Sequence, residues 1–266
     1  MDLRKKSPII KAVFFDIDGT LVSFKTNTVP ESAKQALHKL REKGIKIIVA
    51  TGRSITAIDH IKDLNFDGYI CFNGGYCQTI DGKVLYRNAI NEDDIKSLLN
   101  YSIANEVSFA LMYENKVQIN DVTPEIAAMY AHLNLAVPPL INRDDVDFNS
   151  VLQANIFLGP DKEPEFMKNI MPNSTSARWT SLFADVNAKG LSKKKGVEIF
   201  CEYFDISITE TMSFGDGGND IHMLESTKIG IAMGNANDNL KEIADYITQD
   251  ADADGIWNAL CHFAVI

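Results

Sequence analysis

Two pairs of carboxylates stand where buried strands are expected to end. The first pair is Asp16 and Asp18, which is followed by Gly19 and lies directly after the apolar stretch 9–15. Two carboxylates this close together are costly unless a cation or a proton shares the site. Mg²⁺ prefers hard oxygen ligands of this kind. The alternative is a solvated turn; an EF-hand is a poor fit, because Leu21 stands where that loop needs glycine.

The second pair is Asp216 and Asp220, in the glycine-rich run 215–220 after the expected strand 211–214. Asn219 could be only a helix cap, and Asp220 only a first-turn acid favoured by the helix dipole. Those roles do not account for Asp216 at the strand end. Because ligands of open α/β sheets bind at the carboxyl ends of the strands, this run is a candidate site.

Two further features could hold phosphate oxygens. Thr51, Gly52 and Arg53 follow a second apolar run, and a hydroxyl with free backbone N–H groups can bind phosphate at a helix start. A plain turn into a helix capped by Ser54 is the alternative.

The other feature is a lysine triplet at residues 193–195. An ammonium can neutralise both phosphate and a neighbouring carboxylate. Most lysines are simply solvated, and charge alone does not tell which of the three points inward.

The elements that must position these residues alternate between short apolar runs and stretches with helical spacing. This alternation predicts βαβ units and a doubly wound α/β fold with a parallel sheet. The expected strands are 9–15, 45–50, 69–72, 211–214 and 228–232, and the expected helices are 30–44, 54–64, 193–204, 219–226 and 237–244.

The pattern changes in the middle of the chain. The dipeptide Asp81-Gly82 is typical of a hairpin turn. From about residue 83 onward, the pattern predicts both helices and hairpin-like strands. Expected helices are 92–104, 124–133 and 163–170, and expected strands are 107–112, 116–119, 153–158 and 176–187. A separate α+β module over 83–185 is therefore predicted, inserted into a core formed by 1–82 and 186–266.

Composition narrows the class of protein. Among 266 residues, 45% are hydrophobic and 23% are charged, as in ordinary globular proteins. A net charge of -10 argues against a nucleic-acid binder, although a small phosphorylated metabolite can still bind at a locally positive site. We expect a monomer or a small homo-oligomer.

We expect neither a membrane span nor a secretory signal in this sequence. No run approaches the roughly 18 apolar residues of a membrane helix, so no membrane partner is expected. Lys11 and Asp16 interrupt the apolar stretch near the N-terminus, which makes it a poor secretory signal. The four cysteines lack metal or redox spacing. We therefore expect a cytoplasmic protein with reduced cysteines.

Taken together, these motifs resemble the haloacid dehalogenase (HAD) superfamily along essentially the whole chain. The phosphatase branch begins with Asp-x-Asp-Gly-Thr, as at 16–20, and its second motif ends in Thr or Ser, as at Thr51. Its third motif is a lysine, and the Gly-Leu-Ser-Lys context selects Lys193 over its neighbours. Its fourth, Gly-Asp-x-x-Asn-Asp, matches 215–220. The insert corresponds to the C2 cap position and looks like type IIB, as in Cof-type and bacterial hexose phosphate phosphatases.

The resemblance implies a Mg²⁺-dependent phosphomonoester hydrolase that acts on sugar phosphates or related small phosphometabolites. Asp16 would attack phosphorus and form an aspartyl-phosphate. Asp18 would serve as general acid and base. Mg²⁺ would be held by Asp16, the Asp18 backbone carbonyl and Asp216, with Asp220 a further ligand or a supporting residue. The implied phosphate-binding groups are Thr51, Gly52, Lys193 and Asn219.

Substrate choice is expected to come mainly from the insert. Arg178 and Trp179 are candidates there, because a guanidinium and an aromatic face suit a polar sugar ring; a strand pair that packs the cap sheet is the alternative. Asn73, in the turn after the third strand, and Arg53 could also face substrate or cap.

Other chemistries of the superfamily fit less well. A haloalkanoate dehalogenase would need neither Mg²⁺ nor the second acid, and a transport ATPase would need membrane segments. A phosphomutase shares the aspartyl-phosphate and stays open. A phosphometabolite-binding protein without turnover is disfavoured, because binding alone does not require the nucleophile Asp16 beside the acid Asp18.

Overall fold

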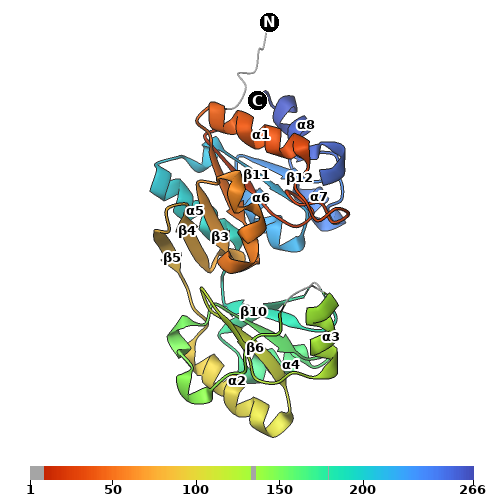
Figure 1. Cartoon of the computed structure of the whole chain (residues 1–266). Helices are drawn as coiled ribbons and strands as arrows, with labels where there is room; N and C mark the ends of the chain where they lie inside the picture. The colour runs from red at the N-terminus through yellow and green to blue at the C-terminus, as the bar shows by residue number, and fades with distance from the viewer. Residues whose placement is uncertain (1–8, 133–135, 179) are drawn as a thin grey trace, which may run out of the picture. The chain divides into compact units, whose positions relative to one another are not determined.

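The computed structural model describes residues 9–132, 136–178 and 180–266. These residues form two compact units, each with its own sheet and core (Figure 1). The first consists of the described residues up to Arg53, of Ala57–Tyr86 and of Ser192–Ile266. The second consists of Ser54–Thr56 and the described residues of Arg87–Leu191.

The first unit is built on a mostly parallel sheet, which over the described ranges has the strand order β13-β12-β11-β1-β2-β3-β4-β5. Central strand β1 pairs in parallel with both β2 and β11, and β3 pairs with β4 in antiparallel fashion. The bounds are β1 (Ala12–Phe15), β2 (Lys46–Ala50), β3 (Gly68–Cys71), β4 (Tyr76–Thr79), β5 (Val84–Arg87), β11 (Thr211–Gly215), β12 (Ile229–Ala232) and β13 (Tyr246–Ile247).

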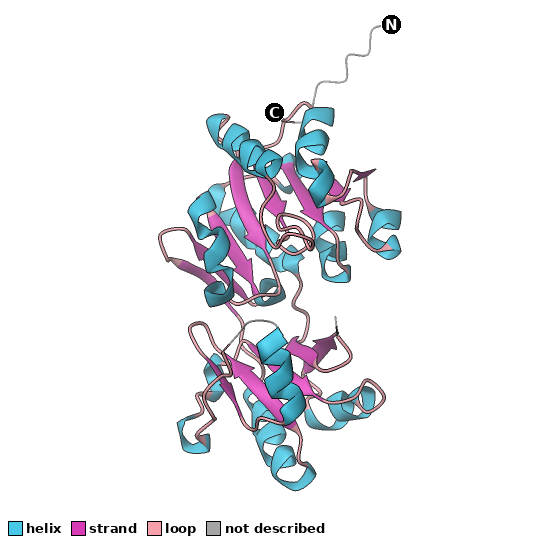
Figure 2. Ribbon diagram, turned by 45° about the vertical axis from the view of Figure 1, so that its right-hand side comes forward, coloured by secondary structure: helices cyan, strands magenta, loops and turns pink. Residues whose placement is uncertain are grey.

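Helices cover both faces of this sheet (Figure 2). The central strands β1 and β2 are apolar apart from Lys46 at the start of β2, because both faces of the sheet are buried. Phe14 and Ile48 pack with Val197 and Met223 in one core, beneath α5 and α6. The helices are α1 (Glu31–Glu42), α5 (Lys193–Phe204), α6 (Ile221–Ser226), α7 (Asp238–Ile243) and α8 (Gly255–His262), with short 3₁₀ turns at η2 (Phe72–Gly74), η5 (Ile208–Glu210), η6 (Gly218–Asp220) and η7 (Ala251–Ala253).

The second unit has an antiparallel sheet in the order β7-β6-β8-β10-β9 across its described residues. Phe109 and Ile156 face a core that also holds Leu98 and Phe166 from α2 and α4, whereas Ala110 packs beside α3 in a smaller cluster. The elements are α2 (Glu92–Asn105), β6 (Ser108–Met112), β7 (Val117–Ile119), α3 (Pro124–His132), η3 (Arg143–Asp145), η4 (Phe148–Ser150), β8 (Gln153–Phe157), α4 (Glu163–Ile170), β9 (Ser174–Ala177) and β10 (Ala184–Ala188).

The predicted α/β core with an inserted α+β unit is confirmed. Two element predictions are wrong. The expected α-helix at 54–64 is a 3₁₀ segment, η1 (Ile55–Leu64), and the hydroxyl of Ser54 hydrogen-bonds to the hydroxyl of Thr56. The expected strand 176–187 is two antiparallel strands, β9 and β10, because the chain turns back between them. The expected boundary at 185/186 consequently falls inside β10, which hydrogen-bonds to β8 and β9.

Nothing in the described helices has the length and apolar character needed to cross a membrane.

Candidate active site

The candidate residues of the first unit gather at one edge of its sheet. Asp16 follows β1, Thr51 follows β2 and Asp216 follows β11. Since these three strands are parallel neighbours, their carboxyl ends meet at the same edge. This is the edge at which open α/β sheets bind their ligands. Lys193 joins them from the first turn of α5.

Lys193 is completely buried between two carboxylates. Its Nζ lies 2.5 Å from Oδ1 of Asp16 and 2.6 Å from Oδ1 of Asp220. The other two lysines of the triplet, Lys194 and Lys195, are about half exposed on the surface of α5. The ammonium therefore joins the end of β1 to the turn after β11, and its two partners provide the charge that a buried lysine needs.

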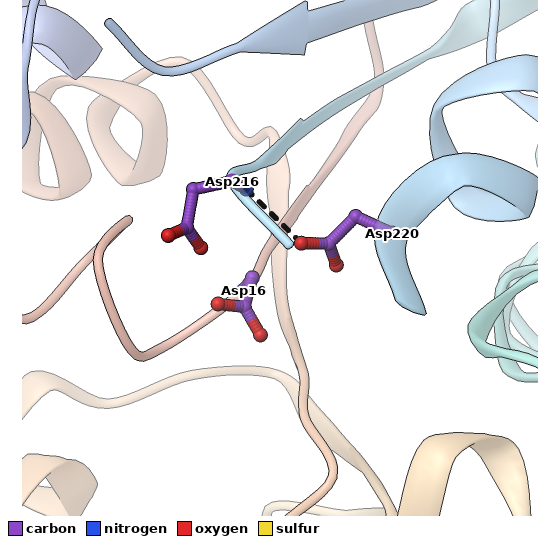
Figure 3. A group of neighbouring side chains, drawn as sticks. All are labelled: Asp16, Asp216 and Asp220. Atoms are coloured by element: carbon purple, nitrogen blue, oxygen red, sulfur yellow. Dashed lines mark hydrogen bonds between the residues drawn. The ribbon is translucent and has the colours of Figure 1, made fainter. Parts of the chain in front are cut away.

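Asp220 has both of its oxygens occupied by protein donors. Oδ1 accepts from Lys193, and Oδ2 accepts the backbone amides of Asp216 and Gly217, each at 3.0 Å. Figure 3 shows the contact to the Asp216 amide as a dashed line. The side chain of Asp220 thus shapes the turn after β11 and holds the lysine.

Asp16 and Asp216 are less fully engaged. Oδ1 of Asp16 accepts a hydrogen bond from Lys193 Nζ. Among the described residues, the contacts to the Asp216 carboxylate are long: 3.4 Å from Thr20 Oγ1 to Oδ1 and 3.4 Å from Asn235 Nδ2 to Oδ2. Carboxylate oxygens of Asp16, Asp216 and Asp220 lie within 4.8 Å of one another (Figure 3).

Burial of this much negative charge changes the ionisation of the cluster. Burial raises the pKa of Asp16 well above its ordinary value, against the opposing effect of Lys193. Burial, and then Asp220, raise the pKa of Asp216 to about 7. Burial alone would lower the pKa of Lys193, but Asp16 and Asp220 outweigh it and the pKa rises. Three carboxylates thus face one ammonium, and a proton or a cation would relieve the excess negative charge.

The donor chemistry of the cluster fits a divalent cation. All available ligands are oxygens, which hard cations prefer. Oδ2 of Asp16 accepts no hydrogen bond from the described residues, and neither does the backbone carbonyl of Asp18. Together with Asp216 they form an oxygen set that could hold such an ion. The cluster contains the three carboxylates that the sequence suggested as metal ligands, and Asp18 was expected to contribute only its backbone carbonyl.

The side chain of Asp18 is instead paired with Arg53. Arg53 donates from Nε to Oδ2 at 2.8 Å and from Nη2 to Oδ1 at 2.6 Å, and its Nη1 donates to the carbonyl of Ala57 at 3.2 Å. Both side chains of the pair are partly exposed. A two-point contact of this kind fixes the orientation of a carboxylate as well as its position.

Three loops meet beside Thr51. Its hydroxyl accepts the amide of Arg53 at 3.1 Å, and its carbonyl accepts the amide of Asn73 at 3.0 Å. Asn73 is in the left-handed region, with φ 53°, and its side chain accepts a hydrogen bond from Asn219 at 3.0 Å. A Cβ at position 52 would lie 3.3 Å from the Asn73 amide, so Gly52 leaves room for this close approach. The structure brings all five of these candidates together.

Arg178 belongs to the second unit and is engaged there. It forms an ion pair with Glu163 and donates to the backbone carbonyls of Leu158 and Ser181. These contacts tie the guanidinium to its own sheet and to α4. A role in substrate binding stays a prediction, and Trp179 lies outside the described residues.

Sequence reasoning overlooked Asn235. Its Nδ2 donates to the carbonyl of Gly19 at 2.8 Å and approaches Asp216, while its Oδ1 accepts the amide of Ala251 at 3.2 Å. The available signal was its position in the loop after β12, another strand of the same parallel sheet.

Comparisons with known proteins agree with this geometry. A model of the haloacid dehalogenase-like hydrolases matches residues 13–260. YkrA of Bacillus subtilis, which is named as a phosphatase, is 31% identical over 250 residues, covering 92% of this chain and 95% of YkrA. The 5-amino-6-(5-phospho-D-ribitylamino)uracil phosphatase YcsE of the same species is 27% identical over 267 residues, covering 100% of both chains.

Solved structures give the same result. The phosphatase BT1666 from Bacteroides thetaiotaomicron aligns with a TM-score of 0.91 and 35% identity over 98% of each chain. The HAD subclass IIB sugar phosphatase BT4131 aligns with a TM-score of 0.85 and 39% identity, covering 96% of this chain and 100% of that one.

Proposed function

Since the chain belongs to the haloacid dehalogenase-like hydrolase family and is a phosphatase, we propose that it hydrolyses sugar phosphates in a Mg²⁺-dependent reaction through an aspartyl-phosphate on Asp16. The observation that carries this proposal is the buried contact of Lys193 with Asp16, which takes one carboxylate oxygen and leaves the other free of protein donors in the described residues. A carboxylate oriented in this way, at the ligand edge of the sheet, is suited to attack an electrophile.

In the first half of the reaction, an oxygen of Asp16 attacks phosphorus in line with the ester bond. A bond forms between that oxygen and phosphorus, and the bond from phosphorus to the ester oxygen breaks, its electron pair leaving with the alkoxide. The carboxyl group of Asp18 gives its proton to this oxygen, so that an alcohol leaves. Arg53 contacts both oxygens of Asp18 in the structure, which fixes the orientation of this carboxyl group.

In the second half, the Asp18 carboxylate takes a proton from water, and the water oxygen attacks phosphorus. The bond between phosphorus and the Asp16 oxygen then breaks, which releases inorganic phosphate and restores the Asp16 carboxylate. The same residue thus serves first as acid and then as base, so the cycle ends with Asp18 protonated again.

The surrounding groups position the phosphoryl oxygens. We assign this role to the hydroxyl of Thr51, the amide of Gly52, the ammonium of Lys193 and the side-chain amide of Asn219. Little covalent chemistry is left to the protein in phosphoryl transfer, so that positioning and charge stabilisation account for most of the catalysis. The contact of Asn219 with Asn73 supports its place in this set.

Mg²⁺ would be held by Asp16, Asp216 and the backbone carbonyl of Asp18. When bound, it supplies positive charge that offsets the negative charge of the phosphoryl oxygens. We assign Asp220 a supporting role, because its two oxygens are taken by Lys193 and by two backbone amides. It holds the lysine and the turn that carries Asp216.

Sugar phosphates, hexose phosphates among them, are the substrate class that the similar proteins favour. BT4131 is described as a sugar phosphatase, and the name of YcsE specifies a phosphate ester of a ribityl chain. Both descriptions concern phosphorylated polyhydroxy compounds. This chain aligns with each of them over at least 96% of its length.

The test is phosphate release from p-nitrophenyl phosphate and from a panel of hexose, pentose, nucleotide and cofactor phosphates. We expect turnover with MgCl₂, loss of turnover in EDTA and recovery when excess MgCl₂ is added. Absence of turnover on every ester, or full turnover in EDTA, would overturn the proposal.

A further inference from the structure

A large apolar side chain lies exposed next to the acidic cluster. Phe24, in the loop that follows the turn after β1, has 65% of its surface exposed. Single exposed apolar residues are common on proteins, so exposure alone indicates nothing. The position of the ring is what singles it out.

The ring of Phe24 and the carboxylate of Asp216 flank the same residue. Gly19 has a φ of +79°, and a Cβ built on it would lie 2.4 Å from Cε2 of Phe24 and 2.3 Å from Oδ2 of Asp216. Any side chain at position 19 would therefore push both groups away. Because position 19 is glycine, the aromatic ring is a close neighbour of a carboxylate that we assign to the metal site.

The loop that carries Phe24 is internally braced. Ser23 is buried, and its Oγ accepts the amides of Lys25 at 3.0 Å and Thr26 at 3.2 Å. Its backbone amide donates to the carbonyl of Thr28, and its carbonyl accepts the amide of Asn27. The ring thus projects from a closed turn, so the backbone of the loop would lose little conformational entropy when a ligand packs against the ring.

We propose that Phe24 is a specificity-determining residue whose ring packs against the leaving group of the phosphate ester and favours leaving groups with a ring. The inference rests on the proposed function. A cyclic sugar presents a flat face of C–H groups that can cover an aromatic ring, and aromatic side chains commonly line such sites. An acyclic alcohol lacks that face.

The test compares two primary alkyl phosphates, glucose 6-phosphate and glycerol 3-phosphate, with wild-type protein and with Phe24→Ala, Phe24→Leu and Phe24→Trp. Matched esters of this kind separate the ring contact from the chemistry at phosphorus. For Phe24→Ala and Phe24→Leu, we expect kcat/KM for glucose 6-phosphate to fall about threefold to tenfold, chiefly through KM, the factor typical of one aromatic contact. We expect glycerol 3-phosphate to be unaffected and Phe24→Trp to retain the preference.

The control is Tyr203→Ala. Tyr203 is also an exposed aromatic residue of the first unit, but it lies at the far end of α5 from Lys193. This substitution should leave kcat/KM unchanged for both substrates. Thermal unfolding of each variant reports whether the protein still folds. If Phe24→Ala does not fold, Phe24→Leu provides the test, because it keeps an apolar side chain of similar size.

An equal loss on both esters, or no loss on either, would overturn the role of Phe24, since a purely structural residue does not distinguish leaving groups. Failure of the wild-type protein to release phosphate would instead overturn the proposed function. In that event, calorimetric titration with the same two esters decides the inference. Weaker binding of glucose 6-phosphate alone by Phe24→Ala supports it, and any other result overturns it.

Discussion

Arg53 donates two hydrogen bonds to the carboxylate of Asp18, at 2.8 Å and 2.6 Å. The two residues are 35 positions apart in the sequence and are brought together because β1 and β2 are parallel neighbours. The carboxyl group that we assign as acid and base is therefore held by a guanidinium in the structure. The orientation of this carboxyl group therefore depends on Arg53.

Replacing Arg53 by lysine should test that contact. A lysine keeps the charge but cannot form the two-point contact, so Asp18 loses its fixed orientation. We expect kcat/KM to fall about tenfold, because hydrogen bonds to charged groups contribute roughly that factor or more. Steady-state kinetics on p-nitrophenyl phosphate measures it.

The matched experiment combines Arg53→Lys with Asp18→Asn in a double-mutant cycle. If Arg53 acts through Asp18, its replacement should matter much less once the carboxyl group is absent. Fully additive losses would show that the two residues act independently.

Asp16→Asn should abolish turnover while the fold is retained. The amide is a poor nucleophile, so we expect a loss of about a thousandfold or more. Phosphate release and circular dichroism, measured on the same preparation, check the two halves of this prediction. Wild-type activity in the variant would contradict the assignment of Asp16.

Asp18→Asn should slow both halves of the reaction. Loss of general acid and base catalysis commonly costs about 10²-fold to 10⁴-fold. We also expect slower decay of the phosphoenzyme, which quenched-flow experiments with labelled substrate can follow. Decay at the wild-type rate would remove the base role of Asp18.

Lys193→Met should destabilise the metal-free protein as well as inactivate it. The substitution leaves Asp16 and Asp220 buried without their shared cation, and breaking a buried ion pair costs about 3–5 kcal/mol. Urea unfolding in EDTA measures the change in free energy. The control is Lys194→Met, on the half-exposed neighbour, which should stay within about 0.5 kcal/mol of wild type. Equal stability of the two variants would contradict a structural role for the buried ammonium.

The pKa of Asp216 predicts how the stability of the metal-free protein depends on pH. Burial raises this pKa from the ordinary 3.8 to about 7, so the folded state holds the proton more tightly than the unfolded chain. The stability that this provides is fully present below about pH 3.8 and is lost as the pH rises through about 7. Asp216→Asn should therefore gain stability relative to wild type between pH 5 and pH 8 in EDTA.

Magnesium should stabilise wild type more than Asp216→Asn, which is the opposite of the effect expected in EDTA. A bound cation favours the carboxylate form, so the melting temperature of wild type should rise with MgCl₂, more at pH 8 than at pH 5. Asp216→Asn should respond weakly. A response of the variant equal to that of wild type would contradict the place of Asp216 in the metal site.

Much of the fold follows from local patterns in the sequence. Buried parallel strands require continuous apolar runs, and the runs that contain β1, β2 and β3 carry that signal without reference to the rest of the chain. The prediction of an α-helix at 54–64 is wrong because helical spacing does not distinguish an α-helix from a 3₁₀ helix. The prediction of a single strand at 176–187 is wrong because the sequence pattern does not reveal the break between β9 and β10.

Local sequence patterns identify the residues at the carboxyl ends of the strands, and hence the candidates Asp16, Thr51 and Asp216. The partners of these residues become known only from the folded chain. It buried Lys193 and left Lys194 exposed, occupied both oxygens of Asp220, and joined Arg53 to Asp18. A strand end is encoded locally, whereas the neighbours of a side chain depend on strand order and on loops that lie far away in the chain.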